Sequence, residues 1–244
     1  MMFFFNNWLL LIPLLFSVLN GSCTQQLSRT KSVPSYVDMG LPSGTLWASC
    51  NLGAQSEEKI GDLYAWGENE IQESYSWNTY LYYEDDSFAT DEDCEPMIMT
   101  KYNLDSLNHK YDGRRILELE DDVVSRKKGV GWHMPTAEDV QELMDFCEWT
   151  WGELNGVQGY WVKGGNNNTL FFPITGFKAD KDFLQKSVLG CYWTSSLKNI
   201  RNSFFASGLT FDKNTIRIEK RPRYFGQAIR PVYNSNNKNN LSLP

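Results

Sequence analysis

The cysteines are the first side chains whose number bears on chemistry. There are five, at positions 23, 50, 94, 147 and 191, and no two have the C-x-x-C spacing of a zinc ribbon or a thioredoxin-like site. An odd number is unusual in an oxidising compartment, but a separate role for Cys23 leaves four that can form two disulfides. Four cysteines allow three pairings, and the spacing alone selects none of them.

Few side chains match those of a catalytic site. The chain has two histidines, His109 and His133, and no G-x-S-x-G motif, so a Ser-His-Asp hydrolase is not indicated. Asp121 or Asp122 could form half of the carboxylate pair that cleaves a glycosidic bond. Acidic residues are also common at helix starts, where they interact favourably with the helix dipole. We therefore expect no enzymatic activity.

Aromatic residues are the best candidates for ligand contact. Trp77, Tyr80, Tyr82 and Tyr83 lie together in a polar segment. On an exposed loop, such rings stack on sugars or anchor protein contacts. The alternative is a strand in which alternate members of the group face the core.

Charge is unevenly distributed along the chain. The net charge is −7, which excludes a general nucleic-acid binder. Residues 84–95 hold seven acids and no base, which indicates a solvated loop, with a structural calcium ion as the alternative. Residues 178–230 hold eleven bases and four acids, which we interpret as a solvent face of strands or a contact to anionic glycans. We expect no other cofactor and no transition-metal site.

These candidate residues have to be positioned by many short strands and two helices. Val140, Leu143, Met144 and Cys147 form one apolar helical stripe after Thr136, whose side chain can cap the first turn. A second helix is predicted over residues 118–128. A hairpin turn is expected at residues 212–214, and strands are predicted at residues 36–40, 45–50, 63–67, 160–163, 169–173, 191–195, 203–211, 215–219 and 227–232. This pattern predicts an α+β fold.

The N-terminus has the features of an export signal. Residues 8–19 form an apolar run that is too short to span a bilayer and matches the hydrophobic region of a signal peptide. Small residues precede Cys23, as in a bacterial lipobox, so we predict a signal peptide over 1–22, lipid attachment at Cys23 and a tether over 23–34. An ordinary signal peptide is the alternative. The domain is predicted over 35–233, followed by a disordered tail over 234–244.

Five ordered segments resemble a known family. They are YVDMGLPSGTLWASCNLGA, GDLYAWGE, LELEDDVVSRKKGVGWHMPTAEDVQEL, GCYWTSS and RYFGQAIRPV, within residues 36–232. They resemble the Fibrobacter succinogenes major paralogous domain, which occurs in exported proteins and lipoproteins of Bacteroidetes. The GWHMPTAEDVQE block also resembles formylglycine-generating-enzyme-like domains. That resemblance implies a C-type-lectin-like fold of short twisted antiparallel strands, two main helices and long loops.

The resemblance implies a location and a class of function. Cys50 and Cys147 both lie in matching blocks, and we predict a disulfide between them, with two buried free thiols as the alternative. We expect an outer-membrane lipoprotein that faces the periplasm or the cell surface. Its predicted function is a non-enzymatic binding or adhesion module for glycans or an envelope protein. The alternative is a structural accessory lipoprotein that binds only a protein partner.

Overall fold

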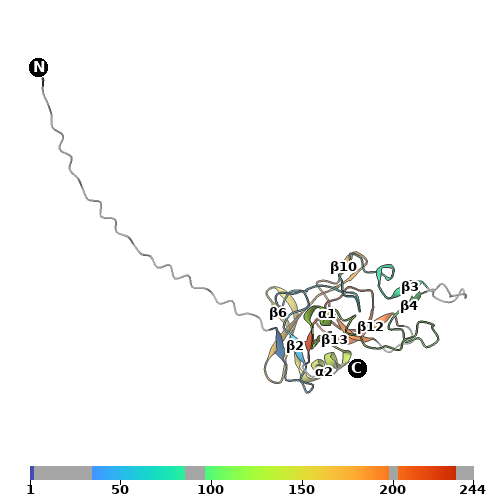
Figure 1. Ribbon diagram of the computed structural model, residues 1–244. Coiled ribbons are helices and arrows are strands. Elements are labelled where there is room, and N and C mark those ends of the chain that lie inside the picture. The colour runs from blue at the N-terminus through green and yellow to red at the C-terminus, as the bar shows by residue number, and fades with distance from the viewer. Residues whose placement is uncertain (3–34, 86–96, 198–202, 235–244) are drawn as a thin grey trace. The chain divides into compact units, whose positions relative to one another are not determined.

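The computed structural model describes residues 1–2, 35–85, 97–197 and 203–234 (Figure 1). Its strands and helices all lie in the unit Val33–Pro244. The helices are α1 (Val123–Lys128), α2 (Ala137–Phe146) and the 3-10 helix η1 (Trp77–Thr79). The strands of the described residues are β1 (Tyr36–Asp38), β2 (Leu46–Ala48), β3 (Tyr83–Asp85), β4 (Met97–Met99), β5 (Trp132–His133), β6 (Glu148–Leu154), β7 (Val157–Lys163), β8 (Thr169–Pro173), β9 (Phe177–Ala179), β10 (Asp182–Leu184), β11 (Gly190–Leu197), β12 (Phe205–Phe211), β13 (Ile216–Pro222) and β14 (Val232–Tyr233).

The strands form several small antiparallel sheets. One sheet has the order β1-β2-β14-β5, and two three-stranded sheets have the orders β6-β7-β8 and β11-β12-β13. The pairs β3-β4 and β9-β10 complete the set within the described residues. The hairpin turn predicted at residues 212–214 is confirmed, because the Asp212 amide donates to the Thr215 carbonyl at 3.0 Å between β12 and β13.

The predicted α+β class is wrong. In the part of the chain that the structure describes, 37% of residues are in strands and 10% are helical, so the fold is mostly β. The expected helix over 118–128 begins only at Val123, because Asp122 caps it with an extended backbone and residues 118–121 form turns. The two helices have six and ten residues, too short to form a helical layer. The C-type-lectin-like architecture with two main helices is corrected accordingly.

The capped helix predicted after Thr136 is confirmed as α2. The Asp139 amide donates to Thr136 Oγ1 at 3.0 Å, and the Thr136 amide donates to the Asp139 carboxylate at 2.8 Å. This capping box satisfies amides that have no partner inside the helix. Val140 and Leu143 are buried, so the predicted apolar stripe does face the core.

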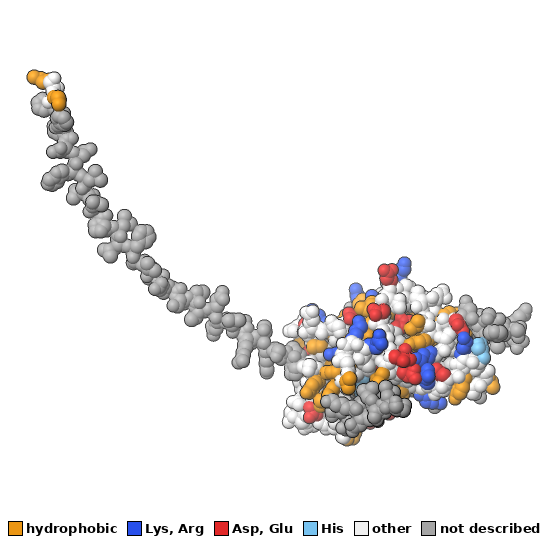
Figure 2. All heavy atoms as spheres, viewed as in Figure 1, with side chains coloured by type: hydrophobic (Ala, Val, Ile, Leu, Met, Phe, Trp, Pro, Cys, Tyr) orange, Lys and Arg blue, Asp and Glu red, His pale blue; other side chains and the backbone are white. Residues whose placement is uncertain are grey.

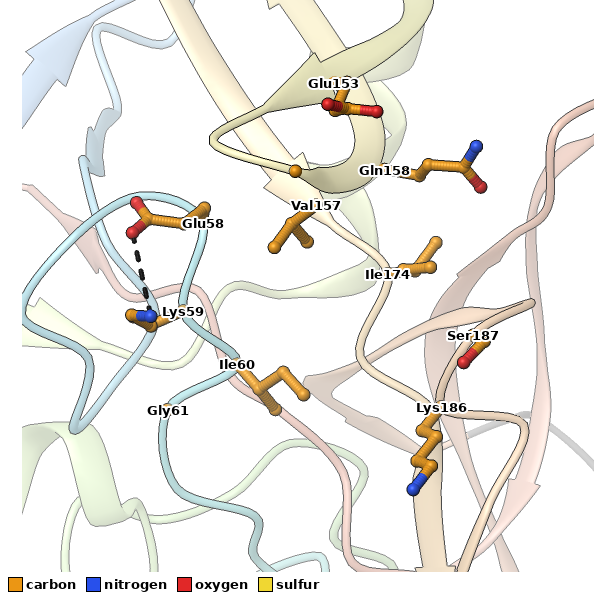
Figure 3. A pocket seen from close by; sticks show the side chains of 11 residues that line it. Glu58, Lys59, Ile60, Gly61, Glu153, Val157, Gln158, Ile174, Lys186 and Ser187 are labelled. Atoms are coloured by element: carbon orange, nitrogen blue, oxygen red, sulfur yellow. Dashed lines mark ion pairs between the residues drawn. The ribbon is translucent and has the colours of Figure 1, made fainter.

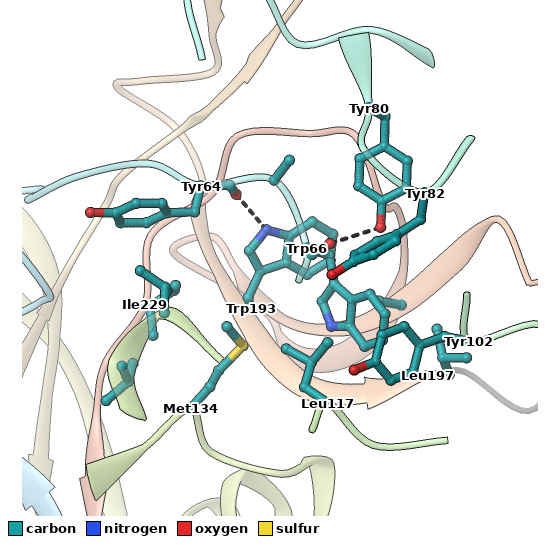
Figure 4. Packing of buried hydrophobic residues seen from close by; sticks show 14 of the residues in the cluster. Tyr64, Trp66, Tyr80, Tyr82, Tyr102, Leu117, Met134, Trp193, Leu197 and Ile229 are labelled. Atoms are coloured by element: carbon teal, nitrogen blue, oxygen red, sulfur yellow. Dashed lines mark hydrogen bonds between the residues drawn. The ribbon is translucent and has the colours of Figure 1, made fainter. Parts of the chain in front are cut away.

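Two hydrophobic clusters form the core. One joins α2 to the sheets β6-β7-β8 and β11-β12-β13, with Trp47, Phe172 and Phe211 among its largest buried side chains. The other surrounds Trp66 and Trp193 and includes Tyr64, Tyr75, Tyr80 and Tyr82 (Figure 4). The indole N–H groups of Trp66 and Trp193 donate to the Thr194 and Tyr64 carbonyls, each at 2.8 Å. Segments far apart in sequence are therefore fixed against each other.

Candidate functional site

The four aromatic residues predicted to contact a ligand divide into two groups. Tyr80 and Tyr82 are only 4% and 7% exposed and lie in the core (Figure 4). Their hydroxyls donate to the Trp66 carbonyl at 2.7 Å and the Gly67 carbonyl at 3.1 Å. This burial corrects the prediction for both residues, whose rings are not available to a ligand. It matches the alternative, in which alternate members of the group face inward.

Trp77 and Tyr83 are half-buried and line a surface cavity of about 360 Å³. Tyr224 lines the same cavity, and its ring centroid is 4.7 Å from that of Trp77. The Trp77 and Tyr83 rings are 5.9 Å apart and inclined at 34°. We call this cavity the aromatic pocket, and its lining is Ser76, Trp77, Asn78, Tyr83, Asp180 and Tyr224.

Backbone pairing brings the two sides of the aromatic pocket together. The Tyr75 amide donates to the Asp180 carbonyl at 2.8 Å, and the Asp180 amide donates to the Tyr75 carbonyl at 2.7 Å. Asp180 follows β9 in the hairpin to β10 and has a φ of 51°, a left-handed conformation that Asp tolerates better than most residues. A similar bridge joins Lys178 to Gly226, which places the turn that carries Tyr224 beside β9.

A buried arginine fixes the segments around the aromatic pocket. Arg223 precedes Tyr224, is 0% exposed, and donates from Nε to the Tyr80 hydroxyl at 2.8 Å. Its other nitrogens donate to the Ser203 carbonyl at 3.0 Å and the Lys101 carbonyl at 3.2 Å. The guanidinium therefore joins residues 80, 101 and 203 to the turn that carries Tyr224.

The aromatic pocket combines ring surfaces with polar groups. Burial raises the pKa of the Tyr224 hydroxyl, and the Asp180 carboxylate raises it further, so this hydroxyl stays protonated at neutral pH. Asp180 offers a carboxylate, Asn78 an amide and Ser76 a hydroxyl along the same lining. Apolar ring faces beside a few convergent polar groups are typical of sites for small polar ligands.

A larger cavity of about 710 Å³ lies between the loop before Gly61, the β6–β7 turn and residues 186–187 (Figure 3). Ile60, Val157 and Ile174 line its apolar part. Charges of both signs also line it, with Glu58 and Lys59 paired at 3.9 Å. This lining has no aromatic ring among the described residues, so it offers less ligand-specific chemistry than the aromatic pocket.

One group of acidic side chains has the spacing of a metal site, but its members bind the ammonium group of a lysine. Glu118, Glu120 and Asp121 bring one oxygen each within 4.8 Å of one another. The Lys101 ammonium bonds all three, at 2.9 Å from Glu118 and Glu120 and 2.5 Å from Asp121. Burial opposes the charge of Lys101, but these hydrogen bonds prevail and raise its pKa. We therefore interpret the group as an ion-pair cluster.

The carboxylates considered for catalysis bind the protein itself. Asp122 is 3% exposed, and its oxygens accept from the Val124 and Met134 amides, each at 2.8 Å. Asp121 accepts from Lys101 and from the Tyr102 hydroxyl. Neither has the free, cleft-facing geometry of a glycosidase acid.

Glu68 also has a structural role. It is 3% exposed and accepts from the Leu81 amide and from Gln72 Nε2, each at 2.8 Å. Burial raises its pKa, against the opposing effect of these hydrogen bonds. Its contact with Leu81 fixes the chain between Tyr80 and Tyr82.

The predicted disulfide is absent. Cys50 and Cys147 are both free thiols and both are partly buried, which matches the alternative of two unpaired cysteines. Burial raises the pKa of the Cys147 thiol. Cys23, the predicted site of lipid attachment, and most of the acidic run at 84–95 lie outside the described residues.

Comparison with protein-family models, curated proteins and solved structures gives no match to this chain. The family resemblance thus stays a prediction based on residues 36–232. The helices of the described ranges are too short or too polar to span a bilayer.

Proposed function

We propose that this chain is a non-enzymatic binding module of the cell envelope that contacts glycans through the aromatic pocket. The observation that carries the proposal is the convergence of Trp77, Tyr83 and Tyr224 on one surface cavity with the polar groups of Asp180 and Asn78. Trp77 and Tyr83 were predicted from the sequence to contact a ligand, and Tyr224 lies about 140 residues further along the chain.

The chemistry of a sugar fits this lining. The C–H groups of a pyranose ring form a flat apolar face, which packs on an aromatic ring, while its hydroxyls need hydrogen-bond partners around the edge. Trp77 and Tyr83 supply ring surface, and Asp180 supplies an acceptor for hydroxyl groups. Asn78 can both donate and accept.

The charge of the aromatic pocket's lining does not favour a polyanion, because Asp180 is its one charged side chain among the described residues. Figure 2 shows acidic and basic side chains interspersed over the visible face of the domain. Two bases of the predicted basic stretch, Arg223 and Arg230, are 0% and 1% exposed, so they contribute no surface for anionic glycans. This supports recognition by ring stacking and hydrogen bonds rather than by a basic patch.

A membrane anchor at Cys23 is part of the proposal. A diacylated Cys23 would hold the domain at an envelope surface by burying its acyl chains in the bilayer. Labelling the expressing cells with an alkyne fatty acid should mark the wild-type chain and not a Cys23→Ser variant. Equal labelling of both would contradict lipid attachment at this residue.

A glycan array tests the binding function. The full chain with Cys23→Ser is compared with the same chain carrying Trp77→Ala or Tyr224→Ala, and with Tyr111→Ala as the control. Tyr111 is 53% exposed and does not line the aromatic pocket. We expect selective binding that falls at least about fivefold in the two pocket variants, because each stacked ring contributes on the order of 1 kcal/mol or more.

The control should bind like the unsubstituted chain. Folding of each variant is checked by its urea midpoint, so that a lost signal is not confused with unfolding. Selective binding that persists in both pocket variants would place the site elsewhere. A folded chain that binds no glycan would contradict the function, and crosslinking for a protein partner would follow.

A further inference from the structure

The charge of the aromatic pocket carries information about its ligand. Asp180 is the single charged side chain among the described residues that line it, and it is exposed. The other lining groups are three aromatic rings, the Ser76 hydroxyl and the Asn78 amide. No lysine or arginine of the described residues contributes to this lining.

Two bases near the aromatic pocket lie over aromatic rings. The Lys178 ammonium lies over the Tyr75 ring, 5.8 Å from its centroid. The Arg221 guanidinium lies over Phe177 and Phe225, at 4.6 and 5.2 Å from the ring centroids. No ion pair among the described residues includes the Asp180 carboxylate, and the exposed Lys181, which follows it in the chain, does not line the pocket.

The rings add to the preference for a positive charge. The faces of aromatic rings are electronegative and attract ammonium groups that come within about 6 Å. Trp77 forms inclined pairs with its neighbours, at 34° to Tyr83 and 64° to Tyr224. All three residues line the aromatic pocket, so their exposed ring surface adds an electronegative lining beside Asp180.

We propose that the aromatic pocket selects glycans that carry a protonated amine, that is, amino sugars with a free amino group. The inference rests on the proposed glycan-binding function and names its ligand class. The ammonium group of the sugar lies against the Asp180 carboxylate and the electronegative ring faces, and the sugar's C–H groups pack on Trp77. N-acetylation removes the charge and keeps the rest of the ligand.

Two probes with one backbone test this proposal. Calorimetric titration of the full chain with Cys23→Ser compares a glucosamine oligomer with the N-acetylglucosamine oligomer of the same length. The experiment is run at about pH 5, where the amine of an amino sugar, which is less basic than that of lysine, is protonated. We expect the free amine to bind about tenfold more tightly, which corresponds to one cation–π contact together with one exposed ion pair.

The decisive variant is Asp180→Asn. Asn is similar in size and, like Asp, tolerates the left-handed φ of 51° at this position, so the hairpin should be retained. We expect the preference for the free amine to fall to about twofold or less. The matched control is Asp182→Asn, which removes one charge from the same hairpin at an exposed residue outside the lining and should keep the preference.

The outcomes separate this inference from the binding function. Equal affinity for both oligomers, or a preference that survives Asp180→Asn, would overturn charge selection while glycan binding stands. Absence of binding by both oligomers would also overturn it, and the array with the Trp77→Ala variant then decides whether the pocket binds other glycans.

Discussion

Replacement of two buried arginines by lysine tests how these side chains stabilise the fold and how one of them, Arg223, holds the aromatic pocket. Arg223 and Arg230 are 0% and 1% exposed, and no ion pair among the described residues includes either one. Each bonds four acceptors, which are mostly main-chain carbonyls. Lysine keeps the positive charge but loses the planar fork that reaches several acceptors at once.

The expected magnitude follows from these bonds. If Arg223→Lys loses two of its four hydrogen bonds, at about 1.5 kcal/mol each, the free energy of unfolding falls by about 3 kcal/mol. With a urea m value of about 2 kcal/mol/M, the midpoint falls by about 1.5 M. Arg230→Lys should cost about the same. The control Arg217→Lys, at an exposed position paired with Glu219, should change the stability by less than about 0.5 kcal/mol.

Ligand binding distinguishes the two buried arginines. Arg223 bonds the hydroxyl of Tyr80, which lies between Trp77 and Tyr83 in the chain, so Arg223→Lys should also weaken glycan binding. Arg230 bonds residues 48, 49, 51 and 171, none of which lines the aromatic pocket, so its variant should bind normally under folding conditions. Midpoints within about 0.5 M of wild type for both variants would refute the reasoning.

Three further predictions concern side chains with a fixed structural role. Burial raises the folded-state pKa of Glu68, so its stabilising contribution is complete below the unfolded pKa of about 4.3 and is lost as the pH rises through the folded value. The stability of Glu68→Gln relative to wild type, measured by urea unfolding, should therefore rise between about pH 4.5 and 7, and a rise no larger than that of the exposed control Glu70→Gln would contradict this. Asp122→Ala should cost about 3 kcal/mol, because it removes a helix cap and leaves a buried amide unpaired; calorimetry showing less than about 1 kcal/mol would count against it. Cys50 and Cys147 should both be alkylated without reductant in the unfolded chain, and a peptide linking the two would disprove free thiols.

The sequence predicted local elements better than the fold class. The strand at residues 169–173 matches β8, because its apolar run is bounded by turn-forming residues. Within the expected strand at 227–232, Gln227 and Ala228 form isolated bridges and Val232 begins β14, since this backbone bonds several distant segments in turn. β6 was missed, although Trp149 and Trp151 alternate with polar residues, and this omission favoured the wrong α+β class.

The candidate site was only partly predictable, because local sequence shows residue types but not burial or distant contacts. Trp77 and Tyr83 stand out as aromatics in a polar segment, but local composition does not separate them from Tyr80 and Tyr82, which face the core. Asp180 carries no local signal, because its place at the aromatic pocket depends on a backbone bridge to a residue more than a hundred positions away.

Local sequence also does not show whether a charged residue is exposed or buried, as the basic stretch at residues 178–230 illustrates. Its positive residues suggested a surface for anionic glycans, yet Arg223 and Arg230 are fully buried and bond main-chain carbonyls. A buried charge without a counter-ion is costly and persists only when several acceptors surround it. The carbonyls that supply these acceptors come from residues 48–49, 101–102, 171 and 203. With many short strands and little helix, the fold leaves such carbonyls at strand ends, in turns and on the outer strand β8, and each arginine satisfies a set of them. Arg223 thus stabilises the frame of the aromatic pocket, and the charge that the described lining presents to a ligand is the negative one of Asp180.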